Sequence, residues 1–309
     1  MQGLVIQYLY LGCVDYAEGL RLQAEMVRLR FEARVGNILL LLEHPPVLTL
    51  GRNANRANIL ASSQMLAARG VTLHEINRGG DVTYHGPGQL VGYPIFDLRD
   101  MRNPATGARL GPVDFVRLME EALIRLCAEF GVRAERICGL TGVWCRPPGL
   151  NSLEERCGTR KASDAPAGER KIGAIGIHVS RGITSHGFAF NVTTDLDGFR
   201  LINPCGITDR PVTSLEKEMA STGRAVADGD LDLEPLAHRA AVQFGHVFEE
   251  RVEAGDGLAA LDPSLAELAG RIGGTQVSGR HAEPTVGVPL EVPKQIEQLQ
   301  GKPERRVRA

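Results

Sequence analysis

Residues 37–43 restrict the fold more than any other segment, because they place five aliphatic side chains in a row. Ile38 to Leu42 read Ile-Leu-Leu-Leu-Leu, between Asn37 and Glu43. The run is too short for an average helix, and it is apolar at both alternating sets of positions. A strand with two apolar faces has to be buried on both sides. The sequence therefore predicts a central strand that is covered on both faces.

Helical and strand patterns follow one another along the rest of the chain. Asp15 with Glu18 forms a capping-box-like start, and apolar residues recur at helical spacing after it. The predicted helices cover 15–34, 62–69, 112–130, a segment that begins at Thr213 with Glu216, and 232–252; the predicted strands cover 47–51, 71–76, 90–98, 172–179 and 188–192. There is no regular strand–helix–strand order, which favours one α+β domain with a mixed sheet over a doubly wound parallel sheet.

Three stretches differ in composition. Residues 1–254 contain the periodic segments and are predicted to form the folded domain. Within them, 146–170 is rich in Pro, Gly, Ser and charged residues, which predicts a flexible surface insertion. The periodicity weakens from residue 255 and the chain ends in a Pro-, Gln- and charge-rich stretch, so 255–309 is predicted to be a disordered tail.

The overall chemistry excludes several functional classes. A net charge of -2 gives no general attraction to nucleic acid or to an anionic membrane. The chain begins without a signal-peptide pattern, and no stretch approaches the ~20 apolar residues of a membrane span. Free thiols in a reducing cytoplasm are therefore expected. Cys138, Cys145 and Cys157 lack the spacing of a zinc site, so we expect no metal.

One glycine-rich segment has the composition of a ligand-binding loop. Arg78-Gly-Gly-Asp-Val-Thr-Tyr-His-Gly-Pro-Gly-Gln89 surrounds charged and aromatic side chains with glycines that allow close approach of the backbone. The side chains of Asp81, Tyr84, His85 and Gln89 could then face a ligand. The alternative is a tight hairpin that binds nothing. The segment matches no nucleotide-binding loop pattern, so it predicts no nucleotide.

Cys205 and Lys171 are the candidate nucleophile and its proton partner. Cys205 lies between a Pro and a Gly, a turn setting rather than a core strand, and a thiolate attacks thioesters well. Lys171 opens an apolar strand, and a partly buried lysine can act as an acid or a base. Each residue also has an ordinary interpretation: Cys205 as an inert loop thiol and Lys171 as a surface lysine with a buried stem.

Three histidines compete with Lys171 as the base for a thiol: His85, His178 and His186. Each is more often structural than catalytic in such a setting. His85 is the strongest of the three, since it lies in the glycine-rich loop. The chain contains no G-x-S-x-G elbow, which disfavours a serine hydrolase of that type.

Six segments, in order, resemble the lipoyl(octanoyl) transferase family, LipB. They cover roughly residues 5–225, and their joint match is highly specific although each piece alone is not. The segments are Glu43-His-Pro-Pro-Val-Leu-Thr-Leu-Gly-Arg52, Arg78-Gly-Gly-Asp-Val-Thr-Tyr-His-Gly-Pro-Gly-Gln-Leu-Val-Gly-Tyr-Pro94, Thr141-Gly-Val-Trp144, Lys171-Ile-Gly-Ala-Ile-Gly-Ile177, His186-Gly-Phe-Ala-Phe-Asn191 and Asn203-Pro-Cys-Gly206.

The resemblance implies a fold like the catalytic domain of biotin and lipoate protein ligases, with helices flanking a mixed sheet. It implies transfer of octanoyl from octanoyl-acyl carrier protein to a lysine of lipoyl domains, the first step of protein lipoylation. The implied acceptors are the lipoyl domains of 2-oxoacid dehydrogenases and the glycine cleavage H protein. Because the donor is already a thioester, no ATP or other cofactor is expected. We also expect a monomer that binds neither nucleic acid nor membrane.

The resemblance also implies a catalytic dyad and a substrate pocket. Cys205 is implied as the acyl-thioester nucleophile and Lys171 as the acid/base group that favours its thiolate. The implied substrate-binding residues are Arg78, Gly79, Gly80, Asp81, Tyr84, His85, Gly86, Gly173, Ala174, Ile175, Gly176, His186, Gly187 and Ala189. Gly173 and Gly176 would leave room for an acyl slot, and Arg52, Arg56 and Arg78 would give a basic surface for an acidic carrier protein.

Two other functions remain open from the residues. An ATP-dependent lipoate or biotin ligase would keep the lysine of the strand but would not need Cys205. A non-catalytic binder of carrier or lipoyl domains would need neither reactive residue. The presence of both residue types, and the lack of a nucleotide-binding loop pattern, favours the transferase.

Overall fold

An eight-stranded mixed sheet forms the centre of the computed structural model, which describes residues 5–146, 168–203, 211–223 and 229–273. The strands follow the order β11-β1-β2-β6-β10-β9-β8-β7. Strand β1 pairs in parallel with β2 and β11, and the other pairs are antiparallel. Their bounds are β1 (Val5–Cys13), β2 (Asn37–Glu43), β6 (Gln89–Ile95), β7 (Ala134–Ile137), β8 (Leu140–Cys145), β9 (Arg170–Ser180), β10 (Ile183–Asn191) and β11 (Arg251–Ala254).

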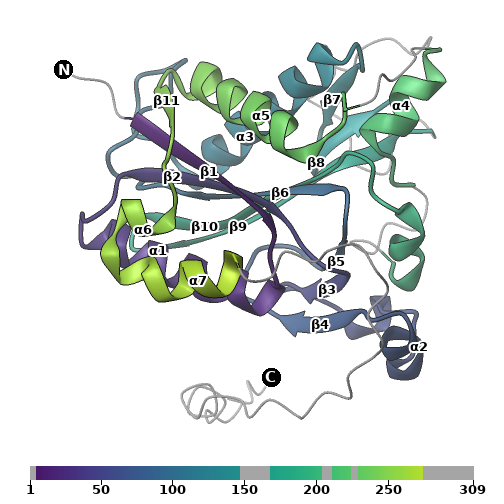
Figure 1. Ribbon diagram of the computed structural model, residues 1–309. Coiled ribbons are helices and arrows are strands. Elements are labelled where there is room, and N and C mark those ends of the chain that lie inside the picture. The colour runs from purple at the N-terminus through teal and green to yellow at the C-terminus, as the bar shows by residue number, and fades with distance from the viewer. Residues whose placement is uncertain (1–4, 147–167, 204–210, 224–228, 274–309) are drawn as a thin grey trace, which may run out of the picture. The chain divides into compact units, whose positions relative to one another are not determined.

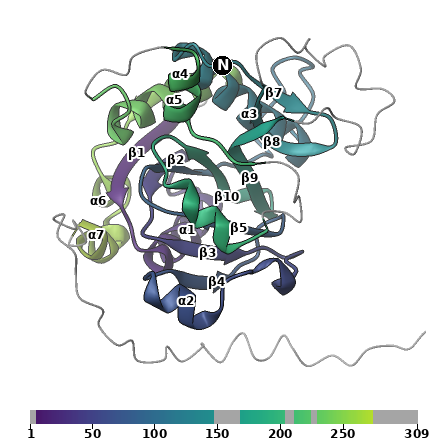
Figure 2. The same ribbon diagram turned by 90° about the vertical axis from the view of Figure 1, so that its right-hand side faces the viewer.

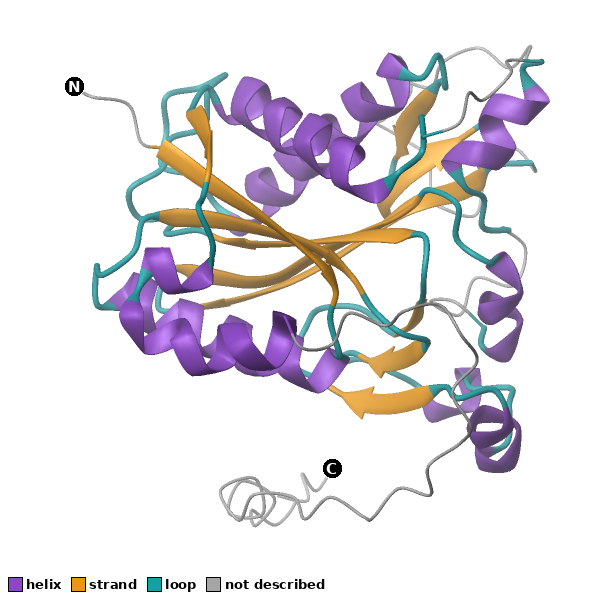
Figure 3. Cartoon of the chain, viewed as in Figure 1, coloured by secondary structure: helices purple, strands orange, loops and turns teal. Residues whose placement is uncertain are grey.

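Helices cover both faces of this sheet (Figure 1 and Figure 3). On one face lie α3 (Pro112–Glu129) and α5 (Leu233–Phe248), with α4 (Leu215–Ser221) near them; on the other lie α1 (Tyr16–Phe31), α6 (Leu258–Leu261) and α7 (Ala266–Gly273). The predicted central strand β2 divides its side chains between the two cores. Leu39 and Leu41 pack with α3 and α5, whereas Ile38, Leu40 and Leu42 pack with α1. This division explains the apolar run and confirms the prediction of a buried strand.

A smaller three-stranded sheet lies beside the main one, with the order β4-β3-β5 (Figure 2). Its strands are β3 (Val47–Leu50), β4 (Thr72–Glu75) and β5 (Val82–His85), and its connections carry η1 (Arg56–Asn58) and α2 (Ser63–Ala68). The 3-10 helix η4 (Leu196–Leu201) contributes Phe199 and Leu201 to the core of this sheet. Since β5 and the loop before it contain most of the glycine-rich segment, the small sheet fixes where that segment lies.

The helix starts follow the capping signals closely. Asp15 caps α1, and its Oδ1 accepts the Ala17 backbone N–H at 2.9 Å, as predicted. For α4 the sequence predicts Thr213 as the start, but the N-cap is Ser214, whose Oγ accepts the Lys217 N–H. The Thr213 hydroxyl instead donates to Glu218 at 2.6 Å. The capping side chain therefore lies one residue later than predicted.

The last predicted helix, 232–252, is too long at its C-terminus. Helix α5 ends at Phe248, and Glu249 adopts a left-handed conformation with φ 54°. Residues 251–254 then form β11, which pairs with the edge of β1. The prediction missed β11 because its partner in the sheet, β1, lies more than 240 positions away in the sequence, and it also missed β1, which pairs with the nearer β2 as well.

The predicted tail also contains regular structure. Helices α6 and α7, with η6 (Pro263–Leu265) between them, place Leu258, Leu265 and Ile272 in the core that α1 covers. The boundary predicted at residue 254 therefore falls before folded residues, and the apolar spacing of these short helices was too weak to indicate them. The rest of the tail, 274–309, and most of the predicted insertion, 147–167, lie outside the described residues. No helix among the described residues is long and apolar enough to cross a membrane.

Leu236 of α5 tests how much the packing against the sheet contributes to stability. It is fully buried, so Leu236→Ala is expected to lower the free energy of unfolding by roughly 2–5 kcal/mol. Leu60 is 61% exposed and serves as a matched control; Leu60→Ala should change stability by no more than about 0.5 kcal/mol. Urea unfolding monitored by circular dichroism measures both. Equal effects of the two variants would contradict this account of the core.

Candidate active site

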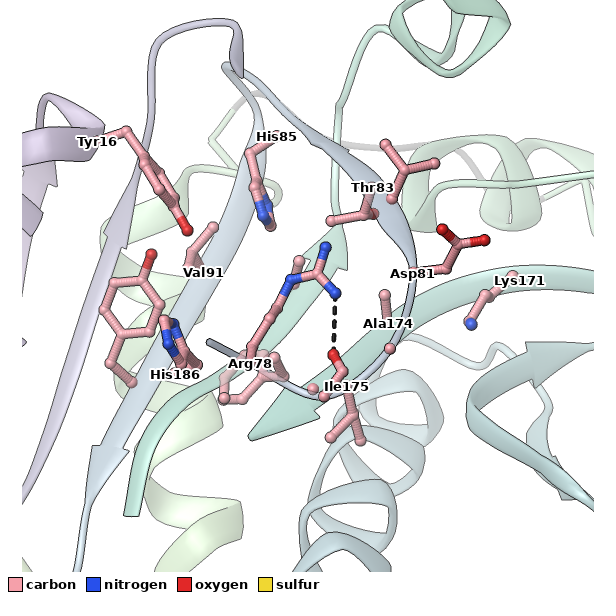
Figure 4. Close-up of a pocket in the computed structure, with 18 residues that line it drawn as sticks. Tyr16, Arg78, Asp81, Thr83, His85, Val91, Lys171, Ala174, Ile175 and His186 are labelled. Atoms are coloured by element: carbon pink, nitrogen blue, oxygen red, sulfur yellow. Dashed lines mark hydrogen bonds between the residues drawn. The ribbon is translucent and has the colours of Figure 1, made fainter. Parts of the chain in front are cut away.

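A cavity opens where the loop before β5 crosses strands β9 and β10. The Gly79 backbone N–H donates to the Ile177 carbonyl at 3.0 Å, which fixes the crossing. A Cβ at Gly176 would lie 2.7 Å from the Gly79 carbonyl oxygen, so glycine is needed where the loop passes over the strand. We call this space the main cavity (Figure 4). Its volume is about 550 Å³, which includes the solvent space at its open side.

Most of the residues predicted for a substrate pocket line the main cavity. They come from the glycine-rich loop, from β9 and from β10, which are distant in sequence. The predicted residues in its lining are Arg78, Gly79, Gly80, Asp81, His85, Lys171, Ala174, Ile175, Gly176, His186, Gly187 and Ala189. The fold thus gathers eleven of the predicted pocket positions and the predicted catalytic Lys171 around one space.

Three predicted pocket residues lie elsewhere. Side chains alternate along β5, and Tyr84 points to the opposite side, where its ring packs 5.4 Å from that of Phe199. A Cβ at Gly86 would lie 2.3 Å from the Tyr84 hydroxyl, so Gly86 makes room for that tyrosine. Gly173 lines a smaller cavity that shares Lys171 with the main one.

Several lining residues were not predicted from the sequence. Tyr16 comes from the first turn of α1, and Val91 and Tyr93 come from β6. The Tyr93 hydroxyl lies 2.6 Å from His44 Nε2, and the other ring nitrogen of His44 lies 2.6 Å from the Val14 carbonyl. This buried aromatic group closes one end of the cavity. These residues come together only through the pairing of β6 with β2 and the packing of α1, so no local sequence pattern could predict their position at the cavity.

Arg78 anchors the glycine-rich loop from inside the protein. Its guanidinium donates to the backbone carbonyl and the hydroxyl of Thr49 at 2.9 Å each, and to the Gly79 carbonyl at 3.0 Å. The side chain is 9% exposed, so it is not part of the predicted basic surface. Arg56, a second residue of that predicted surface, forms an exposed ion pair with Glu75.

Lys171 lies at the edge of the main cavity on the second residue of β9. Its Nζ is 5.0 Å from the centre of the Trp144 ring, a distance at which an ammonium and an aromatic face attract. A Cβ at Gly142 would lie 2.7 Å from Lys171 Cε. The Thr141-Gly-Val-Trp144 motif therefore both leaves space for the lysine side chain and supplies the ring beside it.

Described residues on both sides of the segment 204–210 are held at this site. After the segment, the Pro211 carbonyl accepts the Lys171 N–H and the Thr213 N–H donates to the Lys171 carbonyl, both at 2.9 Å. Before it, the Asn203 N–H donates to the Asn58 carbonyl at 2.6 Å. Asp81 in turn accepts a hydrogen bond from the Asn58 side chain. Cys205 itself lies outside the described residues.

The histidines around the cavity are uncharged at neutral pH. Burial lowers the pKa of His85 to about 3, with the neighbouring His44 adding to the effect, and burial lowers the pKa of His186 and of His44 to about 4. His85 Nδ1 lies 2.7 Å from Gln89 Oε1, so it donates to that amide oxygen. His178, the third candidate base, does not line the main cavity.

No group of three or more His, Cys, Asp or Glu side chains within the described residues is placed to hold a metal ion.

The low pKa values of the buried histidines predict a pH-dependent stability. Unfolded histidine titrates near pH ~6.5, so below that pH the unfolded chain binds protons that the native protein excludes. The free energy of unfolding should therefore fall as the pH drops from about 6.5 to about 5, by up to ~1.4 kcal/mol per pH unit for each of His44, His85 and His186. Urea unfolding across this range measures the slope, and a flat profile would contradict the neutral assignment.

Comparisons with known proteins agree with this architecture. The lipoyl protein ligase A/B catalytic domain family matches residues 15–228. An octanoyltransferase of Acidobacterium capsulatum is 55% identical over 86% of this chain and 99% of that protein. Octanoyltransferases of Koribacter versatilis and Solibacter usitatus are 47% and 43% identical, over 86% and 81% of the chain and 94% and 96% of those proteins.

Solved structures give the same fold at low identity. Lipoate-protein ligase A bound with ATP superposes with a TM-score of 0.56 at 16% identity, over 91% of this chain and 97% of that one. The LipL1 protein of P. falciparum in complex with lipoate gives 0.55 at 11% identity, over 87% and 72%. The predicted mixed α+β fold with a lipoate ligase-like catalytic domain is confirmed. The chain belongs to the octanoyltransferase family, with the lipoyl protein ligase A/B catalytic domain over residues 15–228.

Proposed function

We propose that the protein transfers an octanoyl group from octanoyl-acyl carrier protein to a lysine of a lipoyl domain, through a thioester on Cys205. One observation carries the proposal. Lys171 lies at the edge of the main cavity, and its backbone binds Pro211 and Thr213, the residues that follow the segment carrying Cys205. A lysine at that position can take the proton of the Cys205 thiol and then, as a cation, favour the thiolate.

The first half-reaction moves the acyl group onto the protein. The Cys205 thiolate attacks the carbonyl carbon of the donor thioester, and the bond to the carrier sulfur breaks. Lys171 accepts the thiol proton and returns it to the departing carrier thiolate. The carrier leaves as a free thiol, and Cys205 holds the octanoyl group as a thioester, which splits a difficult acyl transfer into two easier steps.

The second half-reaction forms the amide. The acceptor lysine attacks the Cys205 thioester as a neutral amine, because an ammonium has no lone pair for attack. Lys171 takes the proton that this amine releases and gives it to the Cys205 sulfur as the sulfur leaves. The products are an octanoylated lipoyl domain and the free enzyme, and the donor thioester supplies all the energy, so no nucleotide is consumed.

The main cavity suits an uncharged acyl chain. Val91, Ile175 and Phe188 contribute apolar surface to its lining. His85 and His186 add no charge to this lining, and the Arg78 guanidinium is occupied by hydrogen bonds to Thr49 and Gly79. Each buried methylene is worth ~0.8 kcal/mol, so a slot of this kind can hold an octanoyl group without any polar contact to it.

Intact-mass spectrometry after mixing with octanoyl-acyl carrier protein tests the proposal. Wild type should gain the mass of one octanoyl group, and hydroxylamine should remove it, because hydroxylamine cleaves thioesters. Cys205→Ala should gain nothing and should transfer no octanoyl to a lipoyl domain. Transfer that needs ATP and releases AMP would instead identify a ligase, and the absence of both adduct and transfer would indicate a binding protein.

Gly176 tests whether the acyl chain uses the main cavity. A leucine at this position collides with the Gly79 carbonyl or fills the cavity, so Gly176→Leu should lower octanoyl transfer about tenfold or more. Gly270→Leu on α7 is the matched control, because a Cβ at Gly270 meets nothing within 4 Å. Unchanged transfer by a folded Gly176→Leu protein would place the acyl slot elsewhere.

A further inference from the structure

A second cavity lies next to the main one, between α1 and the β9–β10 hairpin. We call it the α1 recess; Leu20, Gln23, Ala24, Val27, Asn77 and His186 are among its lining residues. Its volume is about 590 Å³, which includes the solvent space at its open side. Among the residues that the structure describes, His186 alone lines both cavities. His186 therefore lies where the two spaces meet.

His186 is held in an uncommon backbone conformation. Its φ is +55° within β10, the left-handed region that side chains other than glycine rarely adopt. Its backbone N–H donates to Gln23 Oε1 at 2.7 Å, and its Nε2 lies 2.7 Å from Asn77 Oδ1. Gln23 and Asn77 thus fix both the backbone and the ring of His186. Strain that the surroundings maintain in this way is often associated with function.

The position of His186 matches the length of an octanoyl chain. Figure 4 shows Lys171 and Asp81 on one side of Arg78, and Tyr16 and His186 on the other. Along β9 the cavity wall runs over Ala174, Ile175 and Gly176, and His186 is paired with the next residue, Ile177. The Lys171 Nζ lies beside Gly173, since a Cβ at Gly142 would be 3.4 Å from that nitrogen and 2.5 Å from the Gly173 carbonyl oxygen. The four residues of strand from Gly173 to Ile177 span about 13 Å. An extended eight-carbon chain spans roughly 9 Å at the bond lengths of an extended backbone, and its bond to sulfur and the radius of its terminal methyl add to that length.

The other residues at this end of the cavity have protein behind them. The Tyr93 hydroxyl bonds to the fully buried His44, and the Tyr16 ring packs against His44 at 4.9 Å. Loss of either ring would leave a hole in a packed interior. Loss of the His186 ring would instead join the main cavity to a space that already exists, with the aliphatic side chains Leu20, Ala24 and Val27 along it.

We propose that His186 sets the upper limit of acyl-chain length, as a wall between the main cavity and the α1 recess. The inference rests on the proposed octanoyl transfer and identifies the residue that determines its specificity. Wild type accepts a chain that ends at His186, and longer chains are excluded because the imidazole occupies the path of their ninth and later carbons. Gln23 and Asn77 are positioning residues for this wall.

His186→Gly tests the proposal with octanoyl- and dodecanoyl-acyl carrier protein as competing donors. Glycine adopts φ +55° without strain and retains the N–H that binds Gln23, so the backbone should persist. The ratio of kcat/KM for dodecanoyl to that for octanoyl should rise about tenfold or more, since the added methylenes enter the recess. His186→Asn, which also tolerates this conformation, should give a smaller rise in the same direction.

Two controls separate a wall from a structural support. Ser185→Ala changes a neighbour that lines only the recess, and its ratio should equal that of wild type. Asn77→Ala removes the hydrogen bond to His186 but keeps the ring, so its ratio should stay well below that of His186→Gly. An unchanged ratio in a folded His186→Gly protein, or an equal rise in Asn77→Ala, would overturn the proposal. Octanoyl transfer by wild type is measured in the same assay, so failure of the proposed function would be visible separately.

Discussion

The crossing of the glycine-rich loop over β9 is the constraint on which the site depends. One backbone hydrogen bond, from Gly79 to Ile177, joins the loop to the main sheet, and Arg78 ties the same loop to Thr49 of the small sheet. Close approach is possible because Gly176 presents no side chain to the loop. The space enclosed between loop, β9 and β10 is the main cavity, so its shape follows from contacts between segments about 100 residues apart.

The electrostatics of the site follow from the same packing. Burial keeps His44, His85 and His186 neutral, and it also raises the pKa values of Tyr16 and Tyr93. The closed end of the cavity therefore holds rings that stay uncharged across the physiological range. Lys171 lies toward the opposite side, next to the Trp144 ring. An uncharged end and an edge that carries a lysine are features suited to binding an acyl chain and activating a thiol.

Much of the fold could be predicted from local patterns. The buried strand β2 and the Asp15 cap of α1 each depend on a few neighbouring residues, and the predictions of both are confirmed. Strand β11 was missed because its stability comes from pairing with β1, which lies far away in the sequence. Tyr84 does not line the main cavity, and the reason is local, since alternation along β5 turns it away from its neighbours Thr83 and His85.

In the site, too, some features follow from local sequence and others only from contacts between distant segments. The glycine-rich loop and Lys171 were found from composition and motif, but Tyr16, Tyr93 and the α1 recess arise only when α1 and β6 pack against the loop.

The rate of Cys205 alkylation by iodoacetamide near pH 7, read by peptide mass spectrometry, tests the central claim that Lys171 activates this thiol. In Lys171→Met the rate should fall about tenfold or more, because the thiolate loses its cation. Cys13, whose pKa burial raises to about 11, should react slowly in both proteins. Equal Cys205 rates in wild type and Lys171→Met would contradict the account.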